Sequence, residues 1–200
     1  MLDETTTGTE HAMALEHAIL VSLSERPTSG LDLAHRFDRS IGFFWSASHQ
    51  QIYKVLRRMD DDGWVSSSTV AQQGRPDRKV YTVTAAGQRE LARWLQAPVP
   101  MEHFRSEIAV KLRGASFGDR AAVLDTVRTH LADHRTRLAH YEGLAARDFP
   151  DPARLDTEHR DIYLVLRGGI LLERFWVDWL AEYLDAHEAA HDTAHEGTPR

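Results

Sequence analysis

The chain of 200 residues contains no cysteine. This absence excludes disulfide bonds, thiolate catalysis, iron–sulfur clusters and zinc sites built on cysteine. A long apolar run is also lacking, because stretches such as residues 170–172 are interrupted by charges within a few positions, so we expect no membrane-spanning segment. The N-terminus is acidic and polar, without the basic and apolar regions of a secretory signal, which favours a cytoplasmic protein.

Charge is unevenly distributed along the chain. The formal net charge is −6, with 42% hydrophobic and 27% charged residues, a composition typical of globular proteins. From Arg26 to Arg93 there are 11 Lys and Arg against 7 Asp and Glu, whereas from Met101 to Arg200 there are 13 against 18. The acidity of the whole chain therefore hides a basic first half, which is compatible with an anionic partner such as nucleic acid.

Two prolines, Pro98 and Pro100, mark a linker near residues 97–101. We expect a first domain before this linker, a second domain after it, and a disordered polar tail at each end. The first domain covers residues 13–97 and the second covers residues 102–187. The tails are residues 1–12 and 188–200.

Three helical segments are predicted in the first half. The first two are short and cover residues 14–24 and 31–37. The third reads ASHQQIYKVLRRM, with Ser46 as its expected N-cap. At helical spacing, its buried stripe is formed by Ile52, Val55, Leu56 and Met59. The opposite, polar face carries Gln50, Lys54 and Arg57.

A β-hairpin is predicted next, because two segments rich in β-branched and aromatic residues flank a turn that contains glycine and proline. The segments are residues 64–70 and 80–84. The tip of the hairpin carries three basic residues, Arg75, Arg78 and Lys79. A further helix begins after Thr84, its expected cap, and contains Gly87 as a tolerated flaw.

The second half reads as helices throughout, over residues 104–112, 118–147 and 155–187. The middle helix carries a heptad-like seam formed by Leu124, Val127, Leu131, His134, Leu138 and Tyr141. The last helix has an apolar stripe wider than one partner helix needs. This width indicates burial against two neighbours, one of them from another subunit.

Three short helices followed by a hairpin with a basic tip are the pattern of a winged helix-turn-helix domain. A helix that enters the major groove needs polar or basic side chains toward the base edges and an apolar side toward its own domain, and residues 46–59 provide both. A basic hairpin tip suits flanking phosphates or the minor groove. The predicted fold is therefore mainly α with a small β-wing: a winged helix-turn-helix domain joined to a C-terminal helical dimerisation domain.

Two stretches resemble the PadR family of transcriptional regulators, namely FWSASHQQIYKVLRRMDDDGWV and GRPDRKVYTVTAAGQREL. The resemblance covers roughly residues 15–96 and includes the Ile-Tyr and Leu-Arg-Arg runs of the third helix and the Gly-Arg-Pro-x-Arg-Lys-x-Tyr wing. The second half is similar to the C-terminal helices of the virulence-activator-like branch. One departure is Leu31, where the family usually has tyrosine after Ser-Gly, and this weakens the case for a DNA contact from the second helix.

The resemblance implies a homodimer that binds double-stranded DNA, commonly as a repressor, and pairs through its C-terminal helices. It further implies release by a small molecule, often a phenolic acid or another aromatic or hydrophobic compound. We accordingly expect no cofactor, no membrane partner and no enzymatic activity. The alternatives are a winged-helix adaptor that binds a protein instead of DNA, and a metalloprotein built on the HEAAH segment.

The candidate DNA contacts lie in the third helix and the wing. Those expected at base edges or in the groove are Ser46, Ser48, Gln50, Gln51 and Lys54. Those expected at phosphates are Tyr53, Arg57, Arg75, Arg78 and Lys79, the wing residues also suiting the minor groove. Each group has a structural alternative: Ser46 as a simple cap, Tyr53 as a packing residue, and the wing cations as solvated charges.

Aromatic residues of the last helix, together with one from the first domain, offer flat walls for an aromatic effector. The candidate pocket consists of Trp94, Phe175, Trp176, Trp179 and Tyr183, and the alternative is that they form a dimer core.

The HEAAH segment at residues 187–191 matches the HExxH zinc pattern, and His195 follows it. We expect no metal site there, because the glycine of the extended pattern and a distant third ligand are both lacking. His130 and His134 are also four residues apart, and we interpret them as interface residues rather than ligands.

Overall fold

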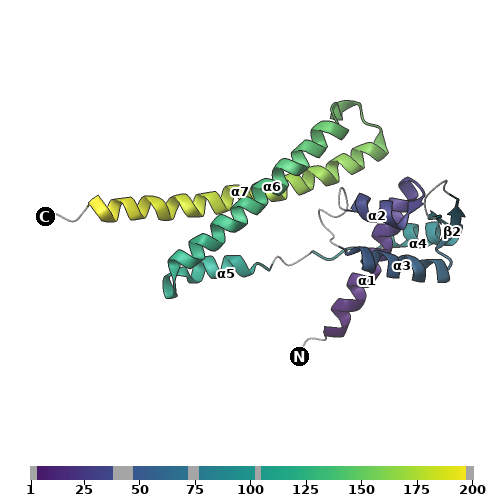
Figure 1. Ribbon diagram of the computed structural model, residues 1–200, viewed down its shortest axis with the longest axis horizontal. Coiled ribbons are helices and arrows are strands. Elements are labelled where there is room, and N and C mark those ends of the chain that lie inside the picture. The colour runs from purple at the N-terminus through teal and green to yellow at the C-terminus, as the bar shows by residue number, and fades with distance from the viewer. Residues whose placement is uncertain (1–3, 38–46, 72–76, 102–104, 197–200) are drawn as a thin grey trace. The chain divides into compact units, whose positions relative to one another are not determined.

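The computed structural model describes residues 4–37, 47–71, 77–101 and 105–196 (Figure 1). The chain divides into two compact units, Met1–Pro100 and Met101–Arg200. The boundary falls in the proline-containing stretch where the sequence predicts a linker.

The first unit combines helices with a small sheet. Its helices are α1 (Glu4–Glu25), α2 (Gly30–Phe37), α3 (His49–Asp61) and α4 (Ala85–Gln96). α1 begins inside residues 1–12, for which the sequence predicts a disordered tail. These residues lack the apolar periodicity of a packed helix, but they also contain no proline that would interrupt one.

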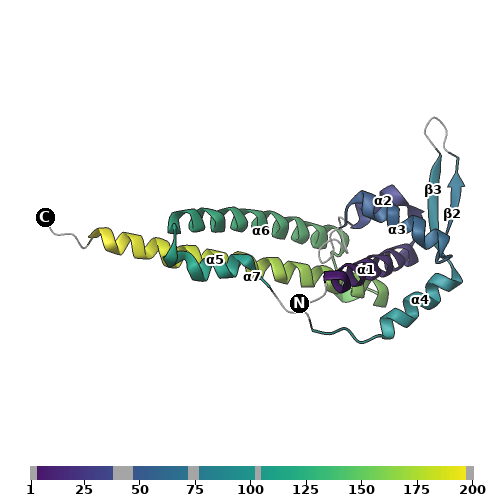
Figure 2. The same ribbon diagram turned by 90° about the horizontal axis from the view of Figure 1, so that it is seen from below.

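The sheet of the described residues has three antiparallel strands in the order β1–β3–β2. They are β1 (Thr28–Ser29), β2 (Val65–Val70) and β3 (Arg78–Val83). β2 and β3 form the predicted hairpin, which is the wing (Figure 2). The sequence does not predict β1, since two residues are too few to show the alternation of a strand.

The buried stripe of α3 packs into a core that the neighbouring elements complete. Ile52, Leu56 and Met59 are fully buried, as predicted. α1, α2 and the sheet supply further members, among them Ile19, Leu20, Leu23, Leu33, Phe37 and Val65. Burial of one such side chain contributes about 1.5–3 kcal/mol, so the core fixes α3 with its polar face outward.

Gly87 lets the start of α4 approach the chain just before β2. Thr84 caps α4 as predicted, its Oγ1 accepting a hydrogen bond from the backbone N–H of Gly87 at 3.2 Å. Gly87 is buried, and a Cβ atom there would collide with the carbonyl oxygen of Trp64. The expectation that this glycine is a mere flaw in the helix is therefore wrong.

The second unit is built from helices. They are α5 (Glu107–Gly114), η2 (Ala115–Phe117), α6 (Arg120–Asp148), η3 (Pro152–Arg154) and α7 (Thr157–Glu196). α6 and α7 lie side by side (Figure 2). α7 extends into the segment expected to be the second tail, again because residues 157–196 contain no proline.

The predicted seam of α6 packs against α7. Leu124, Val127, Leu131 and His134 are buried as predicted. Further along, Leu138 and Tyr141 are half-buried and Leu144 is buried. α5 and α7 complete this second core with Leu112, Leu180 and Leu184. Within the described ranges, no helix combines the length and apolarity needed to cross a membrane.

Candidate nucleic-acid interface

The N-cap of α3 is Ser48 rather than Ser46, which lies outside the described residues. Ser48 Oγ accepts a hydrogen bond from the backbone N–H of Gln51 (3.3 Å), and Gln51 Oε1 accepts one from the backbone N–H of Ser48 (2.8 Å). This reciprocal capping box satisfies two backbone donors at the helix start. Ser48 and Gln51, both predicted to contact DNA, thus have a structural role in positioning α3.

The outer face of α3 is polar and exposed. Gln50, Lys54 and Arg57 lie on the side opposite the buried stripe, as predicted from the helical period. Amide, ammonium and guanidinium groups are suited to base edges and phosphates. His49 is also exposed at the first turn, with its ring 5.9 Å from that of His35 of α2, and the sequence pattern did not single it out.

A cleft of about 590 Å³ lies between the start of α2, the exposed side of α3 and the wing. Four of the predicted DNA contacts line it together: Tyr53, Arg57, Arg78 and Lys79. The folded chain thus gathers phosphate-binding candidates from α3 and β3 in one place. Arg75, the remaining cation of the wing, lies outside the described residues.

Tyr53 both packs on α2 and faces this cleft. Its side chain is 45% exposed, and its ring lies against Gly30, the first residue of α2. A Cβ atom at Gly30 would collide with the ring, so glycine at this position makes room for the tyrosine. Packing and phosphate contact are therefore compatible roles for Tyr53.

Both described cations of the wing form ion pairs with aspartates of the helices. Arg78 pairs with Asp32 of α2, and Lys79 Nζ lies 3.1 Å from Oδ2 of Asp60 in α3. A hydrogen bond from Ser67 and the ammonium of Lys79 hold the pKa of the Asp60 carboxyl below its usual range. Solvent-exposed pairs contribute about 0–1 kcal/mol, so a DNA phosphate could replace either aspartate at little cost.

A second cavity, of about 480 Å³, adjoins the cleft at Asp32 and Arg78, which line both. Its lining adds basic residues that the sequence pattern did not indicate, namely Arg26, His35 and Arg36. Burial and the neighbouring Arg26 lower the pKa of Arg36. Isolated basic residues in short elements show no periodicity, so only the fold reveals that these three lie beside the wing.

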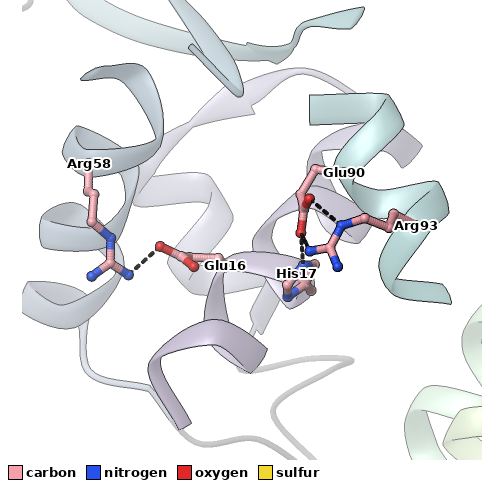
Figure 3. Close-up of polar contacts among 5 residues, drawn as sticks. All are labelled: Glu16, His17, Arg58, Glu90 and Arg93. Atoms are coloured by element: carbon pink, nitrogen blue, oxygen red, sulfur yellow. Dashed lines mark hydrogen bonds and ion pairs between the residues drawn. The ribbon is translucent and has the colours of Figure 1, made fainter. Parts of the chain in front are cut away.

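Two neighbouring residues of α1 hold α3 and α4 in place (Figure 3). Glu16 pairs with Arg58 of α3, and Nε2 of His17 lies 3.0 Å from Oε1 of Glu90 in α4. Because a carboxylate only accepts hydrogen bonds, His17 is the donor. Both α1 side chains are buried. Arg58 therefore supports the position of α3 within the domain.

Trp94 belongs to the first unit, whereas the other candidate effector residues belong to the second. Its ring stacks on that of His17, with centroids 4.6 Å apart and planes at 9°. The stacking of Trp94 on His17 is thus part of the contact between α4 and α1.

The four α7 aromatics lie close together along that helix. Ring centroids of Phe175, Trp176 and Trp179 are 5.4–5.8 Å apart. The hydroxyl of Tyr183 donates a hydrogen bond to the carbonyl oxygen of Leu112 at 3.1 Å. Trp176 lines a cavity of about 490 Å³ within the second unit.

Two described histidines of the second unit, His134 and His187, make protein contacts. Nδ1 of His187 lies 3.3 Å from a guanidinium nitrogen of Arg120, and His134 Nδ1 lies 2.5 Å from Oε2 of Glu173. The remaining side chains of the HEAAH segment, and that of His195, lie outside what the structure describes. Among the described side chains, no group of three or more His, Asp or Glu could hold a metal ion.

The two halves of the chain match two family descriptions. Residues 19–93 match the transcriptional regulator PadR-like family, and residues 104–188 match the virulence activator alpha C-term family. The chain is 50% identical over 184 residues to the probable transcriptional regulator Rv1176c of Mycobacterium tuberculosis, a match that covers 87% of this chain and 97% of that protein. It is 32% identical over 176 residues to the negative transcriptional regulator PadR of Bacillus subtilis, covering 85% and 95%.

Solved structures show the same winged-helix fold. Bacillus subtilis PadR in complex with operator DNA has a TM-score of 0.75 at 30% identity, covering 86% of this chain and 98% of that one. The same regulator with p-coumaric acid has a TM-score of 0.68 at 29% identity, covering 86% and 97%. The virulence activator AphA of Vibrio cholerae has a TM-score of 0.72 at 32% identity, covering 88% and 99%. These matches span both units, and the chain therefore belongs to the PadR-like family of DNA-binding transcriptional regulators.

Proposed function

We propose that the protein is a repressor that binds its operator as a homodimer and leaves it when a small aromatic compound binds. The Bacillus subtilis relative supports this proposal, since it is named a negative regulator and its structures include operator DNA and p-coumaric acid. In this chain, the observation that carries the proposal is the cleft in which Tyr53, Arg57, Arg78 and Lys79 meet beside the exposed face of α3.

The predicted DNA contacts divide by role. Base-edge contacts are assigned to Gln50 and Lys54, at the centre of the outer face of α3. Phosphate contacts are assigned to Tyr53, Arg57, Arg75, Arg78 and Lys79. Ser48 and Gln51 fix the start of α3 through the capping box. Ser46, which lies outside the described residues, stays a predicted groove contact.

The dimer is assigned to α7, which has two apolar faces. One face packs on α6 and includes Leu166, Ile170, Leu180 and Leu184, all buried. Large apolar side chains that are 40–57% exposed gather on the opposite side: Leu164, Val165, Leu171, Leu172 and Phe175. Monomeric proteins rarely expose a contiguous apolar patch of this kind, and a second copy of α7 would bury it symmetrically.

Leu171→Glu tests the dimer by placing a charge within this exposed face. We expect a monomer in multi-angle light scattering and a loss of operator affinity of roughly tenfold or more, because two half-sites are no longer bound by one particle. Val110→Glu on α5 is the matched control, since Val110 is also exposed (72%). A Leu171→Glu protein that stays dimeric and binds DNA would refute this dimer face.

Repression is tested by transcription in vitro from a promoter in the DNA upstream of the protein's own gene. Added protein should lower transcript yield, and p-coumaric acid should restore it. A rise in transcript on addition of protein would make the regulator an activator. Unchanged repression with p-coumaric acid and with other aromatic acids would refute the effector response.

A further inference from the structure

The cavity of about 480 Å³ that adjoins the cleft is strongly basic. Its charged lining consists of three arginines, one histidine and one carboxylate: Arg26, Arg36, Arg78, His35 and Asp32. Even with the histidine neutral, three positive charges stand against one negative charge. A concave surface with this balance attracts an anion.

The fold brings these residues together from three segments. Asp32, His35 and Arg36 are three and four residues apart, so they share the face of α2 that is turned away from the core. Arg26 belongs to the turn between α1 and β1, and Arg78 is the first residue of β3. Pairing of β1 with β3 joins these segments, which are far apart in the sequence.

Arg36 is a cation of fixed position in this cavity. Its Nη1 donates hydrogen bonds to the backbone oxygens of Ser22 at 2.6 Å and of Arg26 at 3.4 Å, and it lies 4.0 Å from Oε2 of Glu25. Burial, followed by the charge of Arg26, lowers the pKa of Arg36. The two guanidiniums therefore repel each other, and an anion between them would stabilise the charge of both.

Arg78 joins the cavity to the cleft. It lines both, as does Asp32, with which its guanidinium forms an ion pair. A hydrogen bond from Ser29 Oγ to Asp32 Oδ2, at 2.9 Å, holds the carboxylate in place. The Nε atom of Arg78 is buried and has no hydrogen-bond partner among the described residues. A DNA strand that places a phosphate in the cleft can therefore continue past this pair into the cavity.

From this continuity we infer that the cavity binds a further backbone phosphate of the operator, next to those held in the cleft. Arg26 and His35, which are exposed, make the contact, and the fixed Arg36 adds its charge. The contact lies outside α3 and the tip of the wing. It carries no base information, so it strengthens binding and fixes the position of the domain on the duplex. The inference rests on the proposed DNA contacts of the cleft, since it extends them along the same strand.

Methylphosphonate substitution tests the contact one phosphate at a time, because it removes the charge of a single phosphate. The duplex is an operator that the full-length protein selects from random sequences, and substitutions are placed in turn along both strands. The unaltered protein should lose roughly fivefold in affinity at the phosphate that meets the cavity, and similar amounts at those that meet the cleft. In Arg26→Gln, the first loss should disappear and the others should remain, as expected when residue and phosphate act as one pair.

A matched arginine on α4 controls for general charge. On the unmodified operator, Arg26→Gln should weaken binding roughly fivefold and reduce the magnitude of the slope of log K against log salt by about 1 per subunit. Arg89→Gln removes the same charge from an exposed position that lines neither the cleft nor the cavity, and it should have neither effect. His35→Ala provides a second test, with an expected loss of about twofold to fivefold. Circular dichroism and light scattering check that each variant is folded.

Equal binding by the unaltered protein, Arg26→Gln and His35→Ala at every salt concentration would overturn the inference. So would weaker binding by Arg26→Gln with an unchanged response to every methylphosphonate, because that result would be a long-range effect of charge.

A free anion is the alternative occupant of the cavity. Thermal stabilisation by inorganic phosphate that Arg26→Gln abolishes, with DNA binding unchanged, would assign the cavity to such an anion and overturn the inference. Failure of the unaltered protein to select or bind any duplex would refute the contacts of the cleft and, with them, this extension. Repression and the effector response are measured separately, by transcription, so the proposed function can stand where this contact fails.

Discussion

Lys79 of the wing and Asp60 of α3 form an ion pair, with Nζ and Oδ2 3.1 Å apart. The pair joins the two elements that are assigned to DNA and holds Lys79 at the cleft. The same carboxylate raises the pKa of Lys79 through this hydrogen bond, so the side chain stays charged. A DNA phosphate must compete with Asp60 for that charge.

Asp60→Asn should therefore tighten operator binding, by up to about fivefold, because it removes a competing partner worth up to about 1 kcal/mol. Fluorescence anisotropy with a labelled operator measures the change. Asp61→Asn is the matched control, since it removes the same charge from the next, exposed position of α3. Equal tightening in both variants would mean that general charge, and not the pair with Lys79, sets the effect.

The salt dependence of binding should report the number of phosphates neutralised. If two or three cations per subunit meet phosphates, a dimer meets four to six, and log K should fall with log salt at a slope of about −4 to −5. Lys79→Ala should reduce the magnitude of this slope by about 2 per dimer. A slope near zero in the unaltered protein would contradict the assignment of these cations to DNA.

Arg57 and Arg58 should respond differently to the same substitution. Arg57 lines the cleft, so Arg57→Gln should weaken binding to operator and random duplexes alike. Arg58 pairs with Glu16, whose side chain is 8% exposed, so Arg58→Gln should lower the free energy of unfolding by about 1–3 kcal/mol and leave DNA affinity nearly unchanged. Urea denaturation and anisotropy separate the two effects, and the opposite outcome would reverse the assigned roles.

Gly87→Ala should destabilise the first unit. The new methyl group would meet the carbonyl oxygen of Trp64, and forced overpacking costs about 1–3 kcal/mol. Gly114→Ala at the end of α5 is the control, because nothing lies within 4 Å of a Cβ atom there. Thermal denaturation should show a lower Tm for Gly87→Ala alone. Equal Tm values for the two variants would show that α4 can move away from Trp64 without cost.

The stability contributed by Glu90 should depend on pH. Hydrogen bonds from Arg93, and then from His17, hold the pKa of Glu90 below its ordinary value of 4.5 (Figure 3). Because the folded state lowers this pKa, the contribution is complete above 4.5 and is lost as pH falls through the lowered value. The difference in unfolding free energy between the wild type and Glu90→Gln should therefore shrink in acid. A difference that is constant from pH 7 to acid would contradict the ion pair.

Much of the fold can be predicted from the spacing of apolar residues along single helices and strands. The spacing of Ile52, Val55, Leu56 and Met59 predicts both the helix and the face that it buries, since each residue turns the helix by a fixed angle. The same rule places Gln50 and Lys54 outward. The cap at Thr84 and the seam of Leu124, Val127 and Leu131 are equally local signals, and the structure confirms them.

Contacts between different helices and strands could not be predicted from the sequence, and only the folded structure shows them. The choice of Ser48 over Ser46 as the N-cap depends on where the chain enters α3, and the stacking of Trp94 on His17 depends on the packing of α4 against α1. The meeting of Tyr53 and Arg78 at one cleft follows from packing and strand pairing between segments far apart in sequence. The sequence by itself determined which faces are apolar and which are charged, because those depend on a repeat along one helix or strand. Which charged groups meet was decided only by the tertiary structure, because that depends on how several such faces pack at once.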